Sequence, residues 1–197
     1  MLGVMGIDGA FMGAGSQAIK NKDVIKLRLN GDAKAVITCY GGLRVESVNN
    51  GQPVVAHYSN LLNEEITILS DANIEATLIG NIFSLAFEQS ESVVGLDVVS
   101  SRTLEEIEVR QMLNIKTLSI ADATALTDLT IDDTPSIDAI YTRAIRAELS
   151  NAVASYITYA ASQGTTGNVY LLADDPYYSI IADAATNANW TVNPLLQ

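Results

Sequence analysis

Residues that could perform acid–base, nucleophilic or metal chemistry are scarce in this sequence. Its 197 residues include one cysteine, Cys39, and one histidine, His57. These counts exclude a disulfide within the chain, a Cys/His zinc site and most histidine-dependent catalysis. The glycine-rich sequences that bind phosphates or dinucleotides, and the Gly-x-Ser-x-Gly sequence of serine hydrolases, are absent. We therefore expect no catalytic residue, no cofactor and no enzymatic activity.

Pairs of adjacent carboxylates are the remaining candidates for chemistry. They occur at Glu64-Glu65, Glu105-Glu106, Asp132-Asp133 and Asp174-Asp175. Neighbouring residues of a strand point to opposite faces of a sheet, so such pairs rarely act together. The two aspartate pairs lie in turn-like sequence, where they either hold Ca²⁺ or are solvated turn residues. We adopt the second interpretation and expect no metal site.

Composition and charge narrow the function further. The chain is 48% hydrophobic and 17% charged, which is enough apolar content to bury a core. Lys plus Arg number 11 against 23 Asp plus Glu, giving a net charge of −12. Nucleic-acid binding needs clustered cations, so we expect none. We see no signal peptide and no apolar run near the ~20 residues of a membrane span, so we expect synthesis in the cytoplasm and no membrane insertion.

Residues 1–21 form a glycine-rich, apolar N-terminal arm. Dense glycine gives poor helix and strand propensity, yet the apolar content is high for a solvated linker. The segment is either an ordinary chain end or an arm that docks on a partner, and we adopt the second interpretation because an exposed apolar segment favours aggregation. The candidate partner-binding residues of the arm are Leu2, Val4, Met5, Ile7, Phe11 and Met12.

Residues 22–72 have the pattern of a small β-rich module. Apolar Ile25, Leu27 and Leu29 alternate with polar residues, and Asn30-Gly31-Asp32 suits a hairpin turn into a second strand at 36–38. Further strands are expected near 43–48, 54–58 and 65–69. We expect His57 to be a hydrogen-bonded framework residue, because no catalytic partner accompanies it.

The same module resembles PKD-like β-sandwich domains. The resemblance is carried by the stretch 35–42, by His57-Tyr58-Ser59 and by Ile66-Thr67-Ile68. Gly42 stands where those domains have an acidic turn residue. We therefore expect no Ca²⁺ site in this turn.

Residues 82–140 carry an 11-residue repeat with three apolar positions per unit. The units are Ile82-x-x-Leu85-x-Phe87, Val93-x-x-Leu96-x-Val98, Leu104-x-x-Ile107-x-Val109, Ile115-x-x-Leu118-x-Ile120, Leu126-x-x-Leu129-x-Ile131 and a final Ile137-x-x-Ile140. This period also suits a right-handed helical coiled coil, but the last two apolar positions have strand spacing and turn formers separate the units. We predict short parallel strands near 85–87, 96–98, 107–109, 118–120 and 129–131, two units to each coil of 22 residues.

Alternate units should present two different outer faces. One face is charged and should be solvated; it contains Glu88, Glu106, Glu108, Arg110, Asp128 and Asp132. The other is small and nearly uncharged, which suits close approach of another element. Its candidate partner-binding residues are Gly95, Val99, Thr117, Ser119 and Ala121. This second face either contacts a partner or is covered by the chain's own helix.

The C-terminal part is predicted to contain a long helix and a closing coil. Thr134-Pro135 suits a helix start and Gly164 a helix end, giving one amphipathic helix of about 28 residues. Its apolar side includes Ile145, Val153 and Tyr156, which we expect to contact a partner. A strand at 169–172, a second helix at 177–188, a left-handed Asn189 and a final strand at 190–192 should follow.

The repeats, with Gly167-Asn168-Val169-Tyr170-Leu171 and Asn189-Trp190-Thr191-Val192, resemble leucine-rich-repeat proteins of Bacteroidetes and their phages. In that group a PKD-like module precedes the repeats, and a Gly-Trp-Thr-Val tail, here with Asn189 for glycine, closes the array. The resemblance implies an α+β fold: a small β-sandwich, then a short leucine-rich-repeat-like β-solenoid capped by a long helix and a final strand-helix-strand coil. The expected domains are 22–72 for the sandwich and 73–197 for the solenoid and its cap.

The resemblance also implies a function. It points to a phage virion structural protein, such as a head fibre, a capsid decoration protein or a tail accessory protein, made in the host cytoplasm. Its expected partners are capsid or other virion proteins and further copies of itself, with a trimer as the expected oligomer. The alternative is a bacterial cell-surface leucine-rich-repeat adhesin, which should carry a signal peptide.

Overall fold

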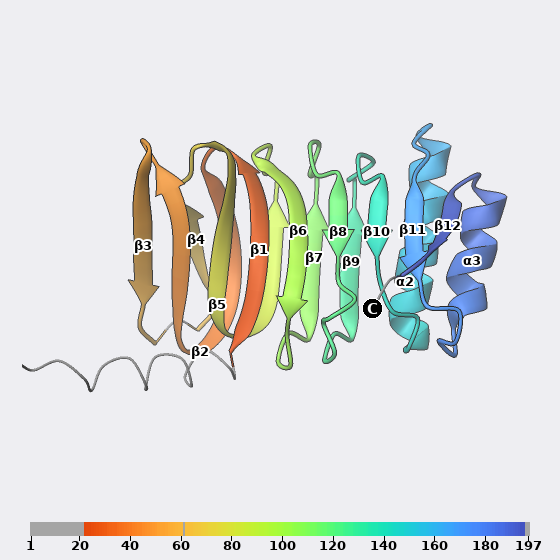
Figure 1. The fold of residues 1–197 in the computed structure, drawn as a ribbon, viewed down its shortest axis with the longest axis horizontal. Helices are drawn as coiled ribbons and strands as arrows, with labels where there is room; N and C mark the ends of the chain where they lie inside the picture. Colours follow the sequence, from red (N-terminus) through yellow and green to blue (C-terminus); the bar gives the residue numbers. More distant parts are fainter. Residues whose placement is uncertain (1–21, 61, 196–197) are drawn as a thin grey trace, which may run out of the picture.

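A computed structural model describes residues 22–60 and 62–195 of the chain. The predicted docking arm, residues 1–21, lies outside this range. The described part is 51% strand and 15% helix. Its strands stand side by side along the long axis of the molecule, and two helices lie at the C-terminal end (Figure 1).

The strands follow one another closely along the chain. They are β1 (Asp23–Asn30), β2 (Ala33–Asn49), β3 (Gln52–Tyr58), β4 (Glu64–Ile68), β5 (Ala72–Glu88), β6 (Val93–Ser100), β7 (Glu106–Arg110), β8 (Thr117–Ser119), β9 (Asp128–Asp132), β10 (Ala139–Tyr141), β11 (Asn168–Leu171) and β12 (Thr191–Pro194). All twelve belong to one mixed sheet.

Two long strands fold this sheet into two layers. The front layer runs β3-β2-β5-β1-β6-β8-β10-β11-β12, and the back layer contains β4, β7 and β9 together with the other halves of β2 and β5. The change of layer in β2 occurs at Gly41 and Gly42, whose φ angles of 71° and 93° suit glycine far better than other residues. In β5 it occurs at Gly80, where a Cβ atom would lie 2.9 Å from the Cys39 Sγ atom. The apolar core lies between the two layers.

The predicted fold class was wrong. We expected a sandwich followed by a separate solenoid with a long helical cap, and the structure has a single mixed sheet with two shorter helices. The expected hairpin between β1 and β2 is also absent, because β1 pairs with β5 and β6 instead. Alternation of apolar residues specifies a strand and its buried face, but it does not specify which strand lies alongside.

The strands expected from the 11-residue repeat are confirmed in position. Leu85 pairs with Ile107, and Ile107 with Leu129, in the parallel ladder β5-β7-β9 of the back layer. Leu96 pairs with Leu118 in the parallel ladder of the front layer. The apolar positions of the units are buried between the layers, apart from a half-exposed Ile131.

Two helices lie behind the C-terminal end of the front layer (Figure 1). They are α2 (Ala147–Ser162) and α3 (Tyr178–Asn187), and α2 packs against β9 and α3. Neither helix is long and apolar enough to span a membrane, and the described residues contain no other helix that is.

The long helix predicted from Thr134 was wrong, because the repeat continues through that segment. The Thr134 side chain is buried; its hydroxyl accepts a hydrogen bond from the Met112 amide (3.1 Å) and donates one to the Asp132 carbonyl (2.8 Å), rather than capping a helix. Ile137 and Ile140 extend the buried columns, and Ile140 pairs with Leu118 in register.

The expected ends of the helices are confirmed. Gly164 follows α2 with a φ of +83°, and the Thr165 amide donates to the Ala160 carbonyl, which closes the last turn. Asn189 follows α3 with a φ of +57°.

Gly167 brings β11 against β10, and we expect its replacement to destabilise the fold. A Cβ at position 167 would lie 2.9 Å from the Asp138 Cα and closer still to the Asp138 carbonyl oxygen. Backbone atoms cannot move aside as a flexible side chain can, so Gly167→Ala should cost about 1–3 kcal/mol in urea unfolding. Thr166→Ala, at an exposed neighbouring position, serves as the control and should change stability little. Equal stability of the two variants would contradict this close approach.

Candidate functional site

The outer face of the front layer, which we call the front face, is an open surface of the described structure. Along the three strands β6, β8 and β10, Leu96, Leu118 and Ile140 point into the core, so their neighbours point outward. The outward residues are Gly95 and Asp97, Thr117 and Ser119, and Ala139 and Tyr141. The chain's own helix does not cover them, since α2 packs behind the front layer on β9.

A groove of ≈310 Å³ crosses the front face from β5 to β10. Its lining consists of Lys26, Arg28, Glu75, Gly95, Leu96, Asp97, Thr117, Ser119 and Tyr141. Three of the five residues proposed for the small face, Gly95, Thr117 and Ser119, therefore lie together in this groove. The other two lie outside its lining: Val99 is exposed near the end of β6, and Ala121 is half-buried beyond β8.

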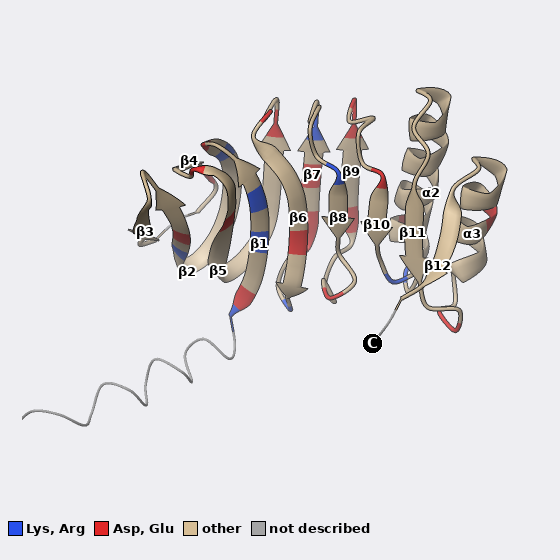
Figure 2. Cartoon of the chain, turned by 45° about the horizontal axis from the view of Figure 1, so that its top comes forward, with Lys and Arg blue, Asp and Glu red and all other residues tan. Residues whose placement is uncertain are grey.

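Charged side chains from β1, β5 and β6 line the groove, so this face carries more charge than the nearly uncharged face that we predicted. The Lys26 ammonium and the Glu75 carboxylate form an ion pair at 2.7 Å, and this hydrogen bond and charge raise the pKa of Lys26. The Arg28 guanidinium lies directly over Gly95, where a Cβ atom would approach its Nε to 2.9 Å. The basic bands of β1 beside the acidic band of β6 are visible in Figure 2.

An aromatic pair closes the β10 end of the groove. Tyr141 and Tyr170 are in-register neighbours on β10 and β11, and their rings are stacked with centroids 4.2 Å apart and planes within 5°. Burial, together with the neighbouring Tyr170 hydroxyl, raises the pKa of Tyr141. Because Tyr170 covers the ring face of Tyr141 on the β11 side, the other ring face of Tyr141 is turned toward Ser119 and the groove.

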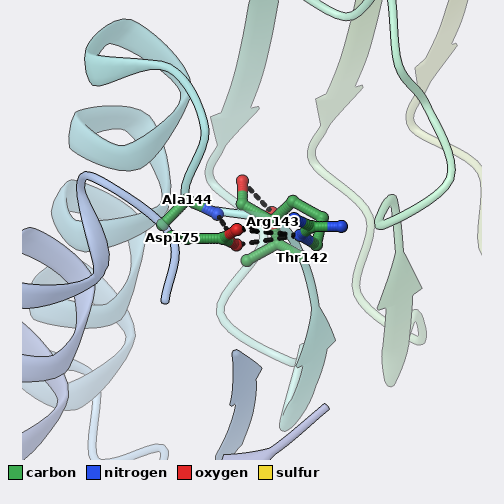
Figure 3. A network of polar contacts seen from close by, with 4 residues as sticks. All are labelled: Thr142, Arg143, Ala144 and Asp175. Carbon is green, nitrogen blue, oxygen red and sulfur yellow. Dashed lines mark hydrogen bonds and ion pairs between the residues drawn. The ribbon is translucent and has the colours of Figure 1, made fainter. Parts of the chain in front are cut away.

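An ion pair just beyond β10 fixes the end of this strand (Figure 3). The Arg143 Nε and Nη2 atoms donate to the two oxygens of Asp175 at 2.7–3.0 Å, and the Ala144 amide donates to Asp175 Oδ2 at 2.9 Å. Burial alone would raise the pKa of Asp175, but these hydrogen bonds and the charge of Arg143 lower it. Arg143 is two residues after Tyr141, so the pair lies close along the chain to the aromatic wall formed by Tyr141 and Tyr170.

The structure places the other candidate residues away from the groove. His57 is exposed on β3, and its side chain has no hydrogen-bond partner among the described residues, so it is not the hydrogen-bonded framework residue that we expected. Cys39 is buried, and its burial raises the pKa of the thiol.

The carboxylate pairs do not gather into a site. Asp132, Asp133 and Asp174 are exposed, whereas Asp175 is buried against Arg143 and is not a solvated turn residue. Within residues 22–60 and 62–195, no group of three or more His, Cys, Asp and Glu side chains could hold a metal ion.

The apolar helix side expected to contact a partner is mostly internal. Val153 and Tyr156 belong to the core, and the Tyr156 hydroxyl donates to the Ile137 carbonyl at 2.9 Å. Ile145 is exposed, but it precedes α2. These helix residues therefore do not form a contact surface.

The aromatic wall is not among the features predicted from the sequence. The predicted helix includes Tyr141, although Tyr141 follows Ser119 by the same 22 residues that separate Ser119 from Asp97. Extending the repeat by one coil would have placed Tyr141 in the same outward row. Arg28 and Glu75 lie outside the repeat, and only the pairing of β1 with β5 and β6 brings them to the groove.

Comparison of the chain with protein-family models, curated proteins and solved structures found no match. The functional interpretation therefore depends on the residues, the geometry and the sequence resemblance described above.

Proposed function

We propose that this chain is a non-enzymatic structural protein of a phage virion that uses its front face as a contact surface. The observation that carries the proposal is the open front face of the nine-strand layer, on which small, aromatic and charged side chains lie in parallel rows. An open surface of this composition suits recognition of a partner more than catalysis, which needs converging titratable groups. The resemblance to phage leucine-rich-repeat proteins supports the virion setting.

Attachment to the particle is assigned to the arm, residues 1–21, which lies outside the described residues. Its apolar side chains would contribute a few kcal/mol if they were buried against a capsid protein, at ~25 cal/mol per Å². We propose capsid or other virion proteins as partners and a closed homotrimer as the assembly. The arm would fix each subunit to the particle and leave the front face free.

Deletion of residues 1–16 tests this proposal. Ordering a glycine-rich segment costs about 1–2 kcal/mol per residue, which exceeds the gain from burying its apolar side chains on the chain itself. We therefore expect the deletion to leave the melting temperature nearly unchanged and to abolish incorporation into particles, as measured by mass spectrometry of purified virions.

The matched control variant has only the polar residues Ser16 and Gln17 replaced by alanine, and we expect this variant to be incorporated into particles normally. Normal incorporation of the deletion variant would refute the anchoring role of the arm. Absence of the full-length chain from purified particles would refute the virion assignment itself.

A second candidate function is favoured by the groove beside Tyr141. A cavity with an aromatic wall and several polar groups is typical of a ligand-binding module, such as a cell-surface adhesin. Detection of the chain on intact bacteria by antibody labelling, and not in particles, would favour this function.

A further inference from the structure

We propose that the front-face groove beside Tyr141 binds a neutral saccharide, with one sugar ring stacked on the free face of the Tyr141 ring. The inference rests on the part of the proposed function that makes the front face a contact surface. It does not require the chain to belong to a virion, because the groove is complete within one subunit.

The aromatic wall provides the stacking surface. The stack on Tyr170, at 4.2 Å, fixes the Tyr141 ring upright on the sheet with its second face toward the groove. A pyranose ring has an apolar face of C–H groups, and an aromatic ring presents a negative face that attracts such weakly positive hydrogens. A preformed ring also loses little side-chain entropy when a ligand binds.

The floor of the groove provides polar side chains that can form hydrogen bonds with the hydroxyl groups of a sugar. Thr117, Ser119, Asp97 and Arg28 line it, and none of their side chains has a hydrogen-bond or ion-pair partner among the described residues. Sugar hydroxyls both donate and accept, so a carboxylate, a guanidinium and two hydroxyls can all pair with one ring. An apolar ligand would leave these groups desolvated and unpaired, which disfavours it.

The charge balance of the groove selects against charged ligands. Its two cations, Lys26 and Arg28, are balanced by Glu75 and Asp97, and Lys26 is already paired with Glu75. An anionic ligand would meet two carboxylates, and a cationic ligand would meet two basic groups. A neutral ligand with many hydroxyls avoids both repulsions.

The size and openness of the groove suit a short segment of a glycan chain. Its ≈310 Å³ lies at the lower end of the range of about 300–1,000 Å³ found for small-molecule sites. The front face extends beyond the groove on both sides, so the remainder of a chain could leave in either direction. Affinity per subunit should be modest and would rise with the number of subunits displayed together.

The test uses the purified full-length chain on an array of neutral and anionic glycans, followed by NMR titration with the neutral oligosaccharide that binds best. We expect neutral glycans to bind, the amide signals of Thr117, Ser119 and Tyr141 to shift, and Tyr141→Ala to lower the affinity at least about tenfold. The matched control is Tyr40→Ala, which removes an exposed aromatic ring that makes a T-shaped contact with Phe83 in the back layer. This variant should bind as the native chain does.

Asp97→Asn provides a second variant at an exposed position, so loss of binding is separable from loss of folding. We expect it to weaken binding while the circular dichroism spectrum and the melting temperature stay unchanged. The proposal is overturned if no neutral glycan binds, if anionic glycans bind in preference, or if Tyr141→Ala and Asp97→Asn both bind normally. Because these measurements use the isolated chain, their failure is distinct from absence of the chain from virions.

Discussion

Replacement of Leu118 by aspartate is expected to destabilise the protein strongly. Leu118 has no exposed surface and lies in register between Leu96 and Ile140, in the middle of β8. The change removes a buried leucyl side chain and places a carboxylate among apolar side chains, where no partner is available. The combined cost should be about 4 kcal/mol or more, a large part of the ~5–15 kcal/mol that stabilises an ordinary domain.

The measurement is denaturant unfolding followed by circular dichroism, beside two reference variants. Leu118→Ala should cost about 2–5 kcal/mol, since it removes apolar contacts without adding a charge. Thr117→Asp introduces the same charge one residue earlier, where the side chain points outward, and should cost far less. Equal effects of aspartate at 117 and 118 would contradict the inward orientation of Leu118.

Removal of the Asp175 carboxylate should also destabilise the fold strongly, by about 3 kcal/mol in Asp175→Ala. This carboxylate accepts hydrogen bonds from the Arg143 guanidinium and from the buried Ala144 amide, so its loss leaves two donors without their acceptor. The estimate lies at the lower end of the range for buried pairs, because the Arg143 side chain is 36% exposed and water can partly replace its partner. Asp174→Ala, at an exposed neighbouring position, is the matched control and should change stability little.

The same pair makes stability depend on pH. The pKa of Asp175 is lowered below its ordinary value of 3.8 in the folded state, so the unfolded chain binds its proton first as the pH falls. The stabilisation from this carboxylate is therefore complete above that ordinary value and is lost as the pH drops through the lower, folded pKa. Urea unfolding between pH 7 and pH 3 should show a steeper loss for the native chain than for Asp175→Asn. Parallel pH profiles would show that the carboxylate does not stabilise the fold through its charge.

The sequence by itself determined the strands of the repeat and their buried faces. Apolar residues such as Leu96, Leu118 and Leu129 recur at intervals that are multiples of 11, and this regularity located the parallel strands. The left-handed residues Gly164 and Asn189 were also predictable, because few residue types tolerate a positive φ. These features depend on contacts or conformations that are local to one strand or one turn.

Only the tertiary structure decided how the strands combine. The pairing of β1 with β5 and β6, and the passage of β2 and β5 through both layers, join residues that are far apart in the chain. The segment after Thr134 has apolar spacing that suits a helix as well as another repeat unit, and pairing with strand β8, its neighbour in the sheet, decided in favour of β10. The groove followed from the same pairings, since Arg28, Asp97 and Tyr141 come from three separate strands. Side-chain periodicity records which residues are buried, whereas the choice of neighbour depends on the free energy of the whole assembled core.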